Sequence, residues 1–355
     1  MRHRMWVACV IAAHGLVLSG HALDLADVDL NGYTSFEYER QIESAAHGAG
    51  DANGSFDADL LDLVLSLRPA DDLRIALDVT WEHGAATEDD YGNAALEYGF
   101  VEHTFSDALR LRAGKMFTPF GIFNEIHTAK PAFLSVKEAA PTNKPERIVA
   151  EASRFFPRWA VGIALRGDAR VGGAAIDYDV MIANGETGSG NPFEEDDNVA
   201  KALAARLRGE LSPTALVGVS FYRDRPGSPE VESLTSVGTE FELQRDRVRV
   251  IGEAVVGSTD RVGSGSVTQV GWFVQPSYYC GYGVTAFARV GRVDPNLDAD
   301  ADAGYELVTG MNVAASDHLF VKVENDHVGG SSASSLGAYP GRDYNEIKAA
   351  VVVGF

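Results

Sequence analysis

Strict alternation of apolar and polar side chains runs through most of this chain and limits its possible folds more than any other feature. The stretch 73–82, LRIALDVTWE, places Leu, Ile, Leu, Val and Trp on one side of an extended chain and Arg, Ala, Asp, Thr and Glu on the other. The last nine residues, IKAAVVVGF, alternate in the same way. Because successive side chains of a β-strand point to opposite faces, this period predicts strands with one apolar face. Helical periodicity is almost absent.

Sixteen segments with this pattern are predicted, and they account for most of the chain. They lie at residues 31–40, 56–67, 73–83, 95–105, 109–118, 158–167, 174–184, 198–210, 214–224, 233–243, 246–257, 268–278, 282–293, 303–314, 318–328 and 343–355. At roughly ten to thirteen residues each, they have the length that a tilted strand needs to cross a bilayer. Strands of soluble proteins average about five or six residues. We therefore predict an all-β fold, a membrane-spanning antiparallel 16-stranded β-barrel, over the alternative of a secreted sandwich or propeller.

The predicted connections between the strands alternate in length. Short turns such as Ser106–Ala108 and Asp168–Gly173 alternate with longer loops, which is the arrangement of outer-membrane barrels. The third long loop, 119–157, is much longer than the others, and it has enough apolar residues to pack against other parts of the protein. Long loops in compact folds are usually functional. We predict that it folds into the barrel as a constriction loop; the alternative is an external loop that covers the mouth or the subunit contacts.

The first 22 residues have the three parts of a secretory signal peptide. Arg2 and Arg4 precede an apolar run from Met5 to Leu18, and the small residues Gly20 and Ala22 precede the expected cleavage site. The apolar run is too short to span a bilayer comfortably, which argues against an N-terminal anchor. Residues 23–355 are expected to form one barrel domain after cleavage.

Charge and motifs exclude several functions. With 30 Lys and Arg against 51 Asp and Glu, the net charge is −21, whereas nucleic-acid binding needs a basic face, so no nucleic-acid partner is expected. No haem-attachment, zinc-protease, phosphate-loop or serine-hydrolase motif occurs. We therefore expect no cofactor, no metal site, no catalytic residues and no enzymatic activity. An outer-membrane enzyme such as a lipase remains the weakest alternative.

Basic residues near the predicted constriction are the candidate pore-lining residues. They are Arg110, Arg112, Arg158 and Arg166 on the fifth and sixth strands, with Lys130, Lys137 and Lys144 on the loop. Rings of Arg or Lys favour anions, and acidic rings favour cations. The predicted polar faces carry about equal numbers of both, and the loops 84–94, 185–197 and 294–302 are acidic. A modest anion preference, weak selectivity and a cation preference all stay open. For any single Arg, an ion pair with a cross-strand acid is the alternative role.

Two stretches carry a family resemblance. LRAGKMFTPFGIFN at 111–124, and ANGE at 183–186 followed by an acidic loop and NVAKA at 198–202, resemble the phosphate-selective porin O/P-like family. The layout of sixteen strands with a long third loop is also similar. The resemblance implies a homotrimeric channel in the outer membrane of a Gram-negative bacterium. The even balance of charge on the polar faces departs from the basic lumen of the phosphate-selective members.

These observations predict a porin for passive diffusion of small hydrophilic solutes or ions. The main alternative is a structural sheath: a barrel that holds an exported partner, such as a multihaem cytochrome, across the membrane.

Overall fold

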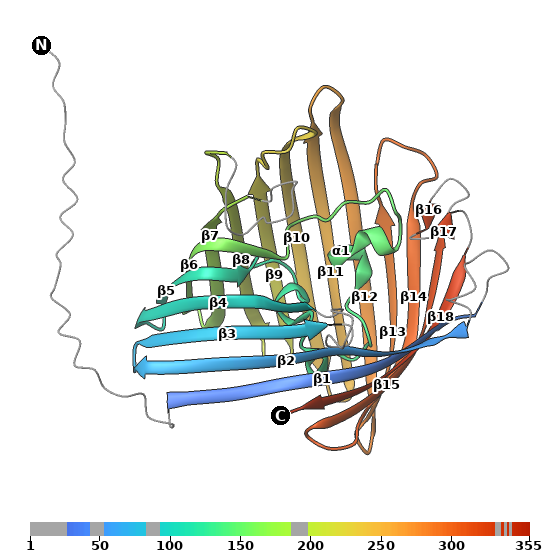
Figure 1. Ribbon diagram of the computed structural model, residues 1–355, viewed down its shortest axis with the longest axis horizontal. Coiled ribbons are helices and arrows are strands. Elements are labelled where there is room, and N and C mark those ends of the chain that lie inside the picture. Colours follow the sequence, from blue (N-terminus) through green and yellow to red (C-terminus); the bar gives the residue numbers. More distant parts are fainter. Residues whose placement is uncertain are drawn as a thin grey trace, which may run out of the picture.

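A single closed barrel of sixteen antiparallel strands makes up the fold (Figure 1). The computed structural model describes residues 27–42, 53–82, 93–185, 198–330, 335–336, 339–340 and 343–355. The barrel strands are β1 (Val28–Gln41), β2 (Ser55–Ala70), β3 (Leu73–Glu82), β4 (Asn93–Ser106), β5 (Leu109–Phe117), β6 (Trp159–Val171), β7 (Ala174–Ala183), β8 (Ala202–Ser212), β9 (Ala215–Asp224), β10 (Val231–Arg245), β11 (Val248–Arg261), β12 (Gly265–Gly281), β13 (Val284–Asp294), β14 (Gly304–Ala314), β15 (Leu319–Gly330) and β18 (Tyr344–Gly354). Each pairs with its neighbour in sequence, β15 pairs with β18, and β18 closes the ring on β1. The short strands β16 (Ser335–Leu336) and β17 (Tyr339–Pro340) form a separate two-stranded sheet.

The predicted fold class and all sixteen predicted strands are confirmed, with shifts at some ends. The turn between β10 and β11 lies at Asp246 and Arg247, two residues later than predicted, because Asp246 adopts the positive φ of 54° that a tight hairpin requires. The predicted loop 258–267 is mostly strand, since Ser258–Asp260 pair with Ser266–Thr268. None of the described residues forms a helix that is both long and apolar enough to span a membrane.

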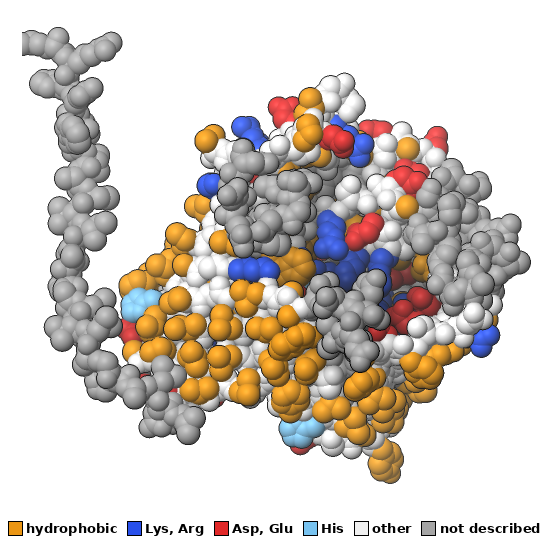
Figure 2. Space-filling view, in the orientation of Figure 1, with side chains coloured by type: hydrophobic (Ala, Val, Ile, Leu, Met, Phe, Trp, Pro, Cys, Tyr) orange, Lys and Arg blue, Asp and Glu red, His pale blue; other side chains and the backbone are white. Residues whose placement is uncertain are grey.

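The two faces of the barrel wall have inverted polarity compared with a soluble protein. On β18, Ile347 and Val351 are 39% and 42% exposed. Lys348, which lies between them in sequence and points to the opposite face, is 5% exposed. On β6 and β7, Ile163 and Ile182 are 56% and 57% exposed. Figure 2 shows apolar side chains covering the outer surface of the strands, with basic and acidic side chains gathered in a central hollow. The period-two pattern thus places apolar side chains outside and charged side chains inside, as a membrane barrel requires.

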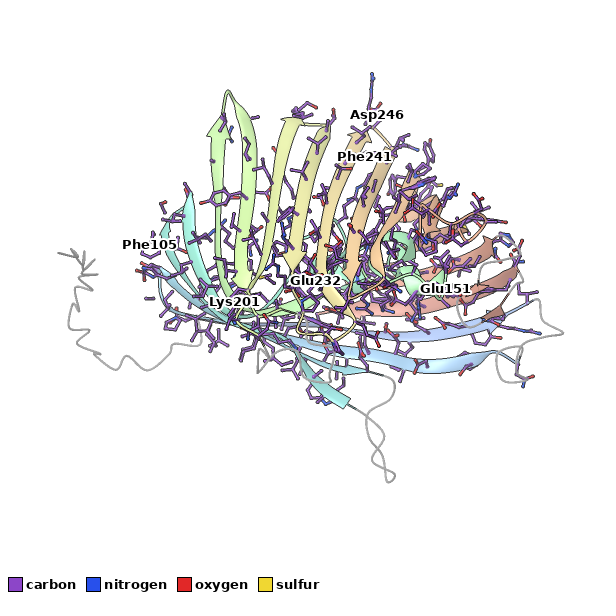
Figure 3. All side chains as sticks on the ribbon, turned by 90° about the horizontal axis from the view of Figure 1, so that it is seen from above. Phe105, Glu151, Lys201, Glu232, Phe241 and Asp246 are labelled. Carbon is purple, nitrogen blue, oxygen red and sulfur yellow. The ribbon has the colours of Figure 1, made fainter. Side chains whose placement is uncertain are left out.

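Short and long connections lie at opposite ends of the barrel, as predicted. Asp246, in a short turn, lies at one end, whereas Lys201, directly before β8, and Glu232, at the start of β10, lie towards the other (Figure 3). Short turns separate β2 from β3, β4 from β5, β6 from β7, β8 from β9 and β12 from β13 as well.

Some sequence predictions fall outside the described residues. The proposed signal peptide, 1–22, lies outside them, and so does most of the acidic loops 84–94 and 185–197. The third acidic loop, 294–302, is described, and its Asp298 and Asp300 are exposed.

Candidate functional site

The segment 118–158, which joins β5 to β6, is a chain of short helical turns. They are η3 (Asn124–Ile126), η4 (Lys130–Ala132), α1 (Ala140–Asn143) and η5 (Pro145–Arg147). Proline occupies one of the first two positions in η4, α1 and η5, where its fixed φ favours a helical start and its missing N–H is not needed. The two strands stay paired up to Phe117 and Trp159, so the whole segment departs from and returns to one point of the wall.

Apolar side chains anchor the segment against the wall. Phe120 and Phe123 are fully buried. Phe120 stacks on Phe156 of the same segment, with 4.2 Å between ring centroids, and its ring lies against Gly238 of β10. Phe123 contacts Phe273 of β12, with 5.7 Å between ring centroids. The helix α1 packs against β11, β12 and β13 (Figure 1). Each buried Phe contributes about 1.5–3 kcal/mol of burial free energy, so these contacts favour one fixed position of the segment.

Glycines on three neighbouring strands make room for this docking. A Cβ at Gly271 of β12 would collide with the carbonyl oxygen of Pro141, and one at Gly291 of β13 would collide with the ring of the same proline. At Gly304 of β14, a Cβ would lie 2.7 Å from a methyl group of Val149. The glycines therefore form a shallow bay in the wall that receives α1 and the residues directly after η5.

Buried cations of the wall bind the backbone of the segment. Lys322 of β15 is 1% exposed, and its Nζ donates hydrogen bonds to the carbonyl oxygens of Lys130, Phe133 and Ser135 at 2.6, 2.6 and 2.9 Å. Arg289 of β13, also 1% exposed, donates to the Ser135 hydroxyl at 3.0 Å. An ammonium has three donors, and those of Lys322 are all used on this one turn.

Buried carboxylates of the wall bind backbone N–H groups of the segment. Glu324 of β15 accepts a hydrogen bond from the N–H of Val136 at 2.7 Å. Glu253 of β11 accepts one from the N–H of Ile122, also at 2.7 Å. Buried side chains of the wall thus take the place of water around the segment's backbone.

Two of the candidate residues, Arg158 and Lys144, meet at one carboxylate of the segment. Arg158 donates two hydrogen bonds to the oxygens of Glu138, at 2.8 and 3.0 Å, and Lys144 lies 3.1 Å from the same group. Burial opposes ionisation of Glu138, but Arg158 and Lys144 overcome it and hold the pKa of this carboxyl well below its usual range. The pKa of the Lys144 ammonium is lowered by its burial, which outweighs the attraction of Glu138.

Two further candidates, Lys130 and Lys137, share acids from β1 and β2. Both pair with Glu37, and both reach Asp59, at 2.7 Å from Lys130 and 3.2 Å from Lys137. Lys137 also lies 3.4 Å from Glu39. Burial disfavours the charged form of Lys137, but Glu37 and Asp59 outweigh it and raise the pKa of its ammonium. The segment is therefore tied by ion pairs to the seam where the barrel closes.

The three remaining candidates lie on β5 and β6 and are paired within the wall. Arg112 lies 2.7 Å from Glu102 and packs over the ring of Phe100, and Arg166 lies 2.8 Å from Asp179. Arg110 pairs with Asp168 at 2.5 Å, close to the short-turn end of the barrel. The seven candidates are thus spread over several clusters, and Arg110 lies apart from the segment.

Sequence reasoning missed Arg206 of β8 as a member of the site. It is 5% exposed and lies between Asp179 at 3.4 Å and Glu125 of the segment at 2.5 Å. Burial opposes ionisation of Glu125, but Arg206 and Arg166 lower its pKa. Alternation places Arg206 on the polar face of its strand, but no local signal shows which loop residue a wall side chain meets.

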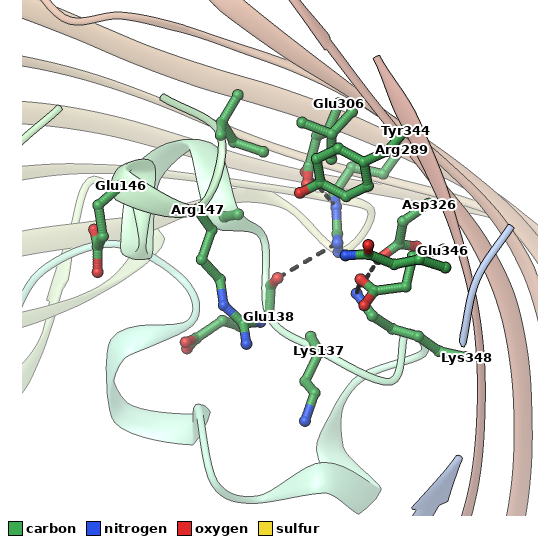
Figure 4. Close-up of a pocket in the computed structure, with 14 residues that line it drawn as sticks. Lys137, Glu138, Glu146, Arg147, Arg289, Glu306, Asp326, Tyr344, Glu346 and Lys348 are labelled. Atoms are coloured by element: carbon green, nitrogen blue, oxygen red, sulfur yellow. Dashed lines mark hydrogen bonds and ion pairs between the residues drawn. The ribbon is translucent and has the colours of Figure 1, made fainter. Parts of the chain in front are cut away.

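Sequence reasoning also passed over Arg147, at the end of η5. It lines a cavity of about 250 Å³ between the segment and β13, β14, β15 and β18 (Figure 4). Figure 4 shows Arg147 and Glu138 of the segment across the cavity from Arg289, Glu306, Asp326 and Lys348 of the wall, whereas the Lys137 ammonium points away from these wall residues. Among the described residues, no cluster of three or more His, Cys, Asp or Glu side chains is arranged to hold a metal ion.

The role of Lys322 in fixing the segment is testable. We expect Lys322→Met to leave three carbonyl groups without their donor, so that the 130–135 turn loosens and its amide hydrogens exchange faster with deuterium. Lys348→Met is the matched control, because it removes a buried cation on β18 that pairs with Asp326 and Glu346 of the wall. Equally fast exchange at residues 130–135 in the two variants would contradict a specific role for Lys322.

Comparisons with known proteins identify the fold. No protein-family model matches the sequence, and no curated protein matches it either. Among solved structures, the chain resembles an anion-selective porin from Comamonas acidovorans, with a TM-score of 0.68 at 11% identity over 92% of this chain and 99% of that one. It also resembles OmpF of Salmonella typhi in a complex with daunomycin (TM-score 0.64, 10% identity, 94% and 100% coverage). A third similar structure is the outer-membrane channel DcaP of Acinetobacter baumannii (TM-score 0.60, 11% identity, 94% and 99% coverage). The likeness establishes that this chain has the fold of the porin barrels.

Proposed function

We propose that the protein is an outer-membrane porin, without enzymatic activity, through which small hydrophilic solutes and ions diffuse passively. The observation that carries this proposal is the closed ring of sixteen strands with apolar side chains outside and charged side chains inside. Barrels of 16–18 strands leave an aqueous channel, and a charged interior keeps that channel wet. The fold shared with porins and channels of other bacteria supports the same function.

We propose further that residues 119–157 lie in the lumen and form the constriction. The support is that the segment's partners are the buried polar side chains of the wall, including Lys322, Arg289, Glu253 and Arg206. These side chains come from β8, β11, β13 and β15, so the contacts of the segment reach across much of the ring. A loop outside the barrel would contact the apolar face instead.

The same contacts bear on selectivity, for which we propose a modest anion preference. The side chains of Lys137 and Lys144 are 19% and 33% exposed, and Arg147 is exposed as well. Arg110, Arg112 and Arg166 of the wall, and Arg158 directly before β6, are held by acids and act mainly as supports. These three cations, Lys137, Lys144 and Arg147, therefore set the field at the constriction, opposed by nearby acids. Membership of the phosphate-selective porin O/P-like family is part of this proposal, supported by the two motifs.

Liposome swelling tests the proposed function. We expect vesicles containing the purified protein to swell in isotonic arabinose and more slowly in larger neutral sugars, because a passive pore sieves by size. Vesicles with heat-denatured protein are the control. Vesicles that do not swell in any sugar, from protein that migrates as a folded barrel on a gel, would refute the porin and favour the sheath for an exported partner.

The export and assembly of the protein belong to the same proposal. A signal peptide cleaved after Ala22 would make Leu23 the first residue of the protein in outer-membrane fractions, which N-terminal sequencing checks. The homotrimer rests on the family resemblance, and cross-linking in native membranes, followed by gel electrophoresis, tests it. A monomer under these conditions would overturn the trimer and leave the channel function standing.

A further inference from the structure

We propose that the cavity beside Arg147 is a binding site for a small solute that carries both a carboxylate and an ammonium group, the chemistry of a free α-amino acid. The cavity lies between the segment and the strands β13, β14, β15 and β18 (Figure 4). This inference deepens the proposed function and rests on it, since such a solute would occupy the site on its way through the barrel.

Arg147 supplies the end of the site that binds the carboxylate. Within the described part of the chain, its guanidinium has no hydrogen bond or ion pair, and the side chain is exposed. The other cations that line the cavity are already engaged: Arg289 with Glu306 at 2.8 Å, Lys348 with Asp326 at 2.5 Å, and Lys137 with Glu37. A guanidinium presents a planar fork of donors that fits a carboxylate with two parallel hydrogen bonds. Arg147 is the cation of this cavity that is left for a ligand.

Asp326 supplies the end that binds the ammonium. It is 6% exposed, its Oδ2 pairs with Lys348, and its Oδ1 is buried without a hydrogen-bond partner. A buried acceptor without a donor costs about 1–3 kcal/mol, which an ammonium donor from a ligand would offset. Glu346, which also lines the cavity, is a second acceptor on the neighbouring strand β18.

Size and shape limit the ligand further. At about 250 Å³, the cavity lies below the roughly 300–1,000 Å³ of pockets for drug-sized ligands, so it suits a small molecule. Ala140, Ile148 and Val328 form an apolar part of its lining. A short aliphatic side chain would pack there while the two charged groups of the ligand reach Arg147 and Asp326.

The charges around the cavity disfavour a simple anion. Four basic side chains line it, against five carboxylates. The carboxylates belong to Glu138, Glu146, Glu306, Asp326 and Glu346. An inorganic phosphate would place one or two negative charges among these acids, and like charges placed together cost binding free energy. A zwitterion matches both ends of the cavity at once.

The test compares three probes that share an isobutyl group, by titration calorimetry on the purified protein in detergent. L-Valine carries both charges, 3-methylbutanoate lacks the ammonium, and isobutylamine lacks the carboxylate. We expect L-valine to bind at least about tenfold more tightly than either analogue, because each analogue loses one charge-assisted contact. Similar affinity for all three probes, or no binding of L-valine, would overturn the inference.

Variants locate the site. We expect Arg147→Gln to weaken L-valine binding about tenfold and to leave the weak binding of isobutylamine unchanged. Arg292→Gln on β13 is the matched control, since it removes one positive charge from an exposed side chain that does not line this cavity. Unchanged L-valine binding in Arg147→Gln would contradict the site. Conductance of the same preparation separates the two proposals: an open channel that ignores L-valine overturns this inference alone, and a closed barrel that binds it overturns the porin alone.

Discussion

Replacing residues 119–157 with a four-residue linker of glycine and asparagine is expected to raise the single-channel conductance severalfold. The ends of β5 and β6 already meet, since Phe117 pairs with Trp159 and the N–H of Thr118 donates to the carbonyl oxygen of Arg158 at 3.0 Å. A short linker therefore closes the hairpin without moving the wall. With the segment gone, the bore is set by the ring of sixteen strands, whose side chains become hydrated. Planar-bilayer recording of single channels measures the change.

The matched control shortens a different long connection. Residues 225–230 join β9 to β10, and we expect the same linker there to leave the conductance unchanged. Equal conductance of the 119–157 variant and the unmodified protein would show that the segment does not narrow the bore. A variant that does not refold is distinguished from this outcome by the heat-modifiable gel migration of folded barrels.

A second large effect is expected from Glu138→Gln, which should lower the free energy of unfolding by about 3 kcal/mol. Arg158 is 5% exposed and directs two hydrogen bonds at the Glu138 carboxylate. Removing one partner of a buried pair leaves an uncompensated charge, which costs about 3–5 kcal/mol. Denaturant titration followed by tryptophan fluorescence provides the measurement, and Trp159 is next to the site.

A double variant and a pH series control this prediction. Glu138→Gln with Arg158→Gln is expected to be more stable than Glu138→Gln alone, because no buried guanidinium is left without a carboxylate. The pKa of Glu138 is lower in the folded than in the unfolded protein, so its contribution to stability is present above the unfolded pKa of about 4.3 and is lost as the pH falls through the folded value. The gap between the unmodified protein and Glu138→Gln should stay constant from pH 8 to pH 5 and shrink below about pH 4. A gap that grows on acidification would contradict the assigned pair.

The wall of the barrel could be predicted from the sequence because the direction of each wall side chain depends only on nearby residues of the same strand. Whether Lys348 points inwards and Ile347 outwards depends only on the alternation within one strand, and the structure confirms both positions. The turns were less predictable, since alternation continues through a tight hairpin. The turn at Asp246 depends on a single left-handed residue, which the period does not show.

The site could be predicted only in part because its contacts join distant parts of the chain. The sequence placed Lys130 and Lys137 on the segment, but their partner Glu37 lies on β1, about a hundred residues earlier. Period-two patterning gives the face of a wall side chain and not its place around the ring. The glycine bay at Gly271, Gly291 and Gly304 is invisible for the same reason, since three glycines on three strands become neighbours only when the sheet forms.

Reversal potential in a planar bilayer, across a tenfold gradient of KCl, tests the central claim most directly. A passive porin with cations on its constriction should give a steady, ohmic conductance and a small reversal potential of anion-selective sign. A cation-selective sign would mean that the acids outweigh Lys137, Lys144 and Arg147 at the constriction. Absence of any conductance, from protein shown to be a folded barrel, would contradict the diffusion channel itself.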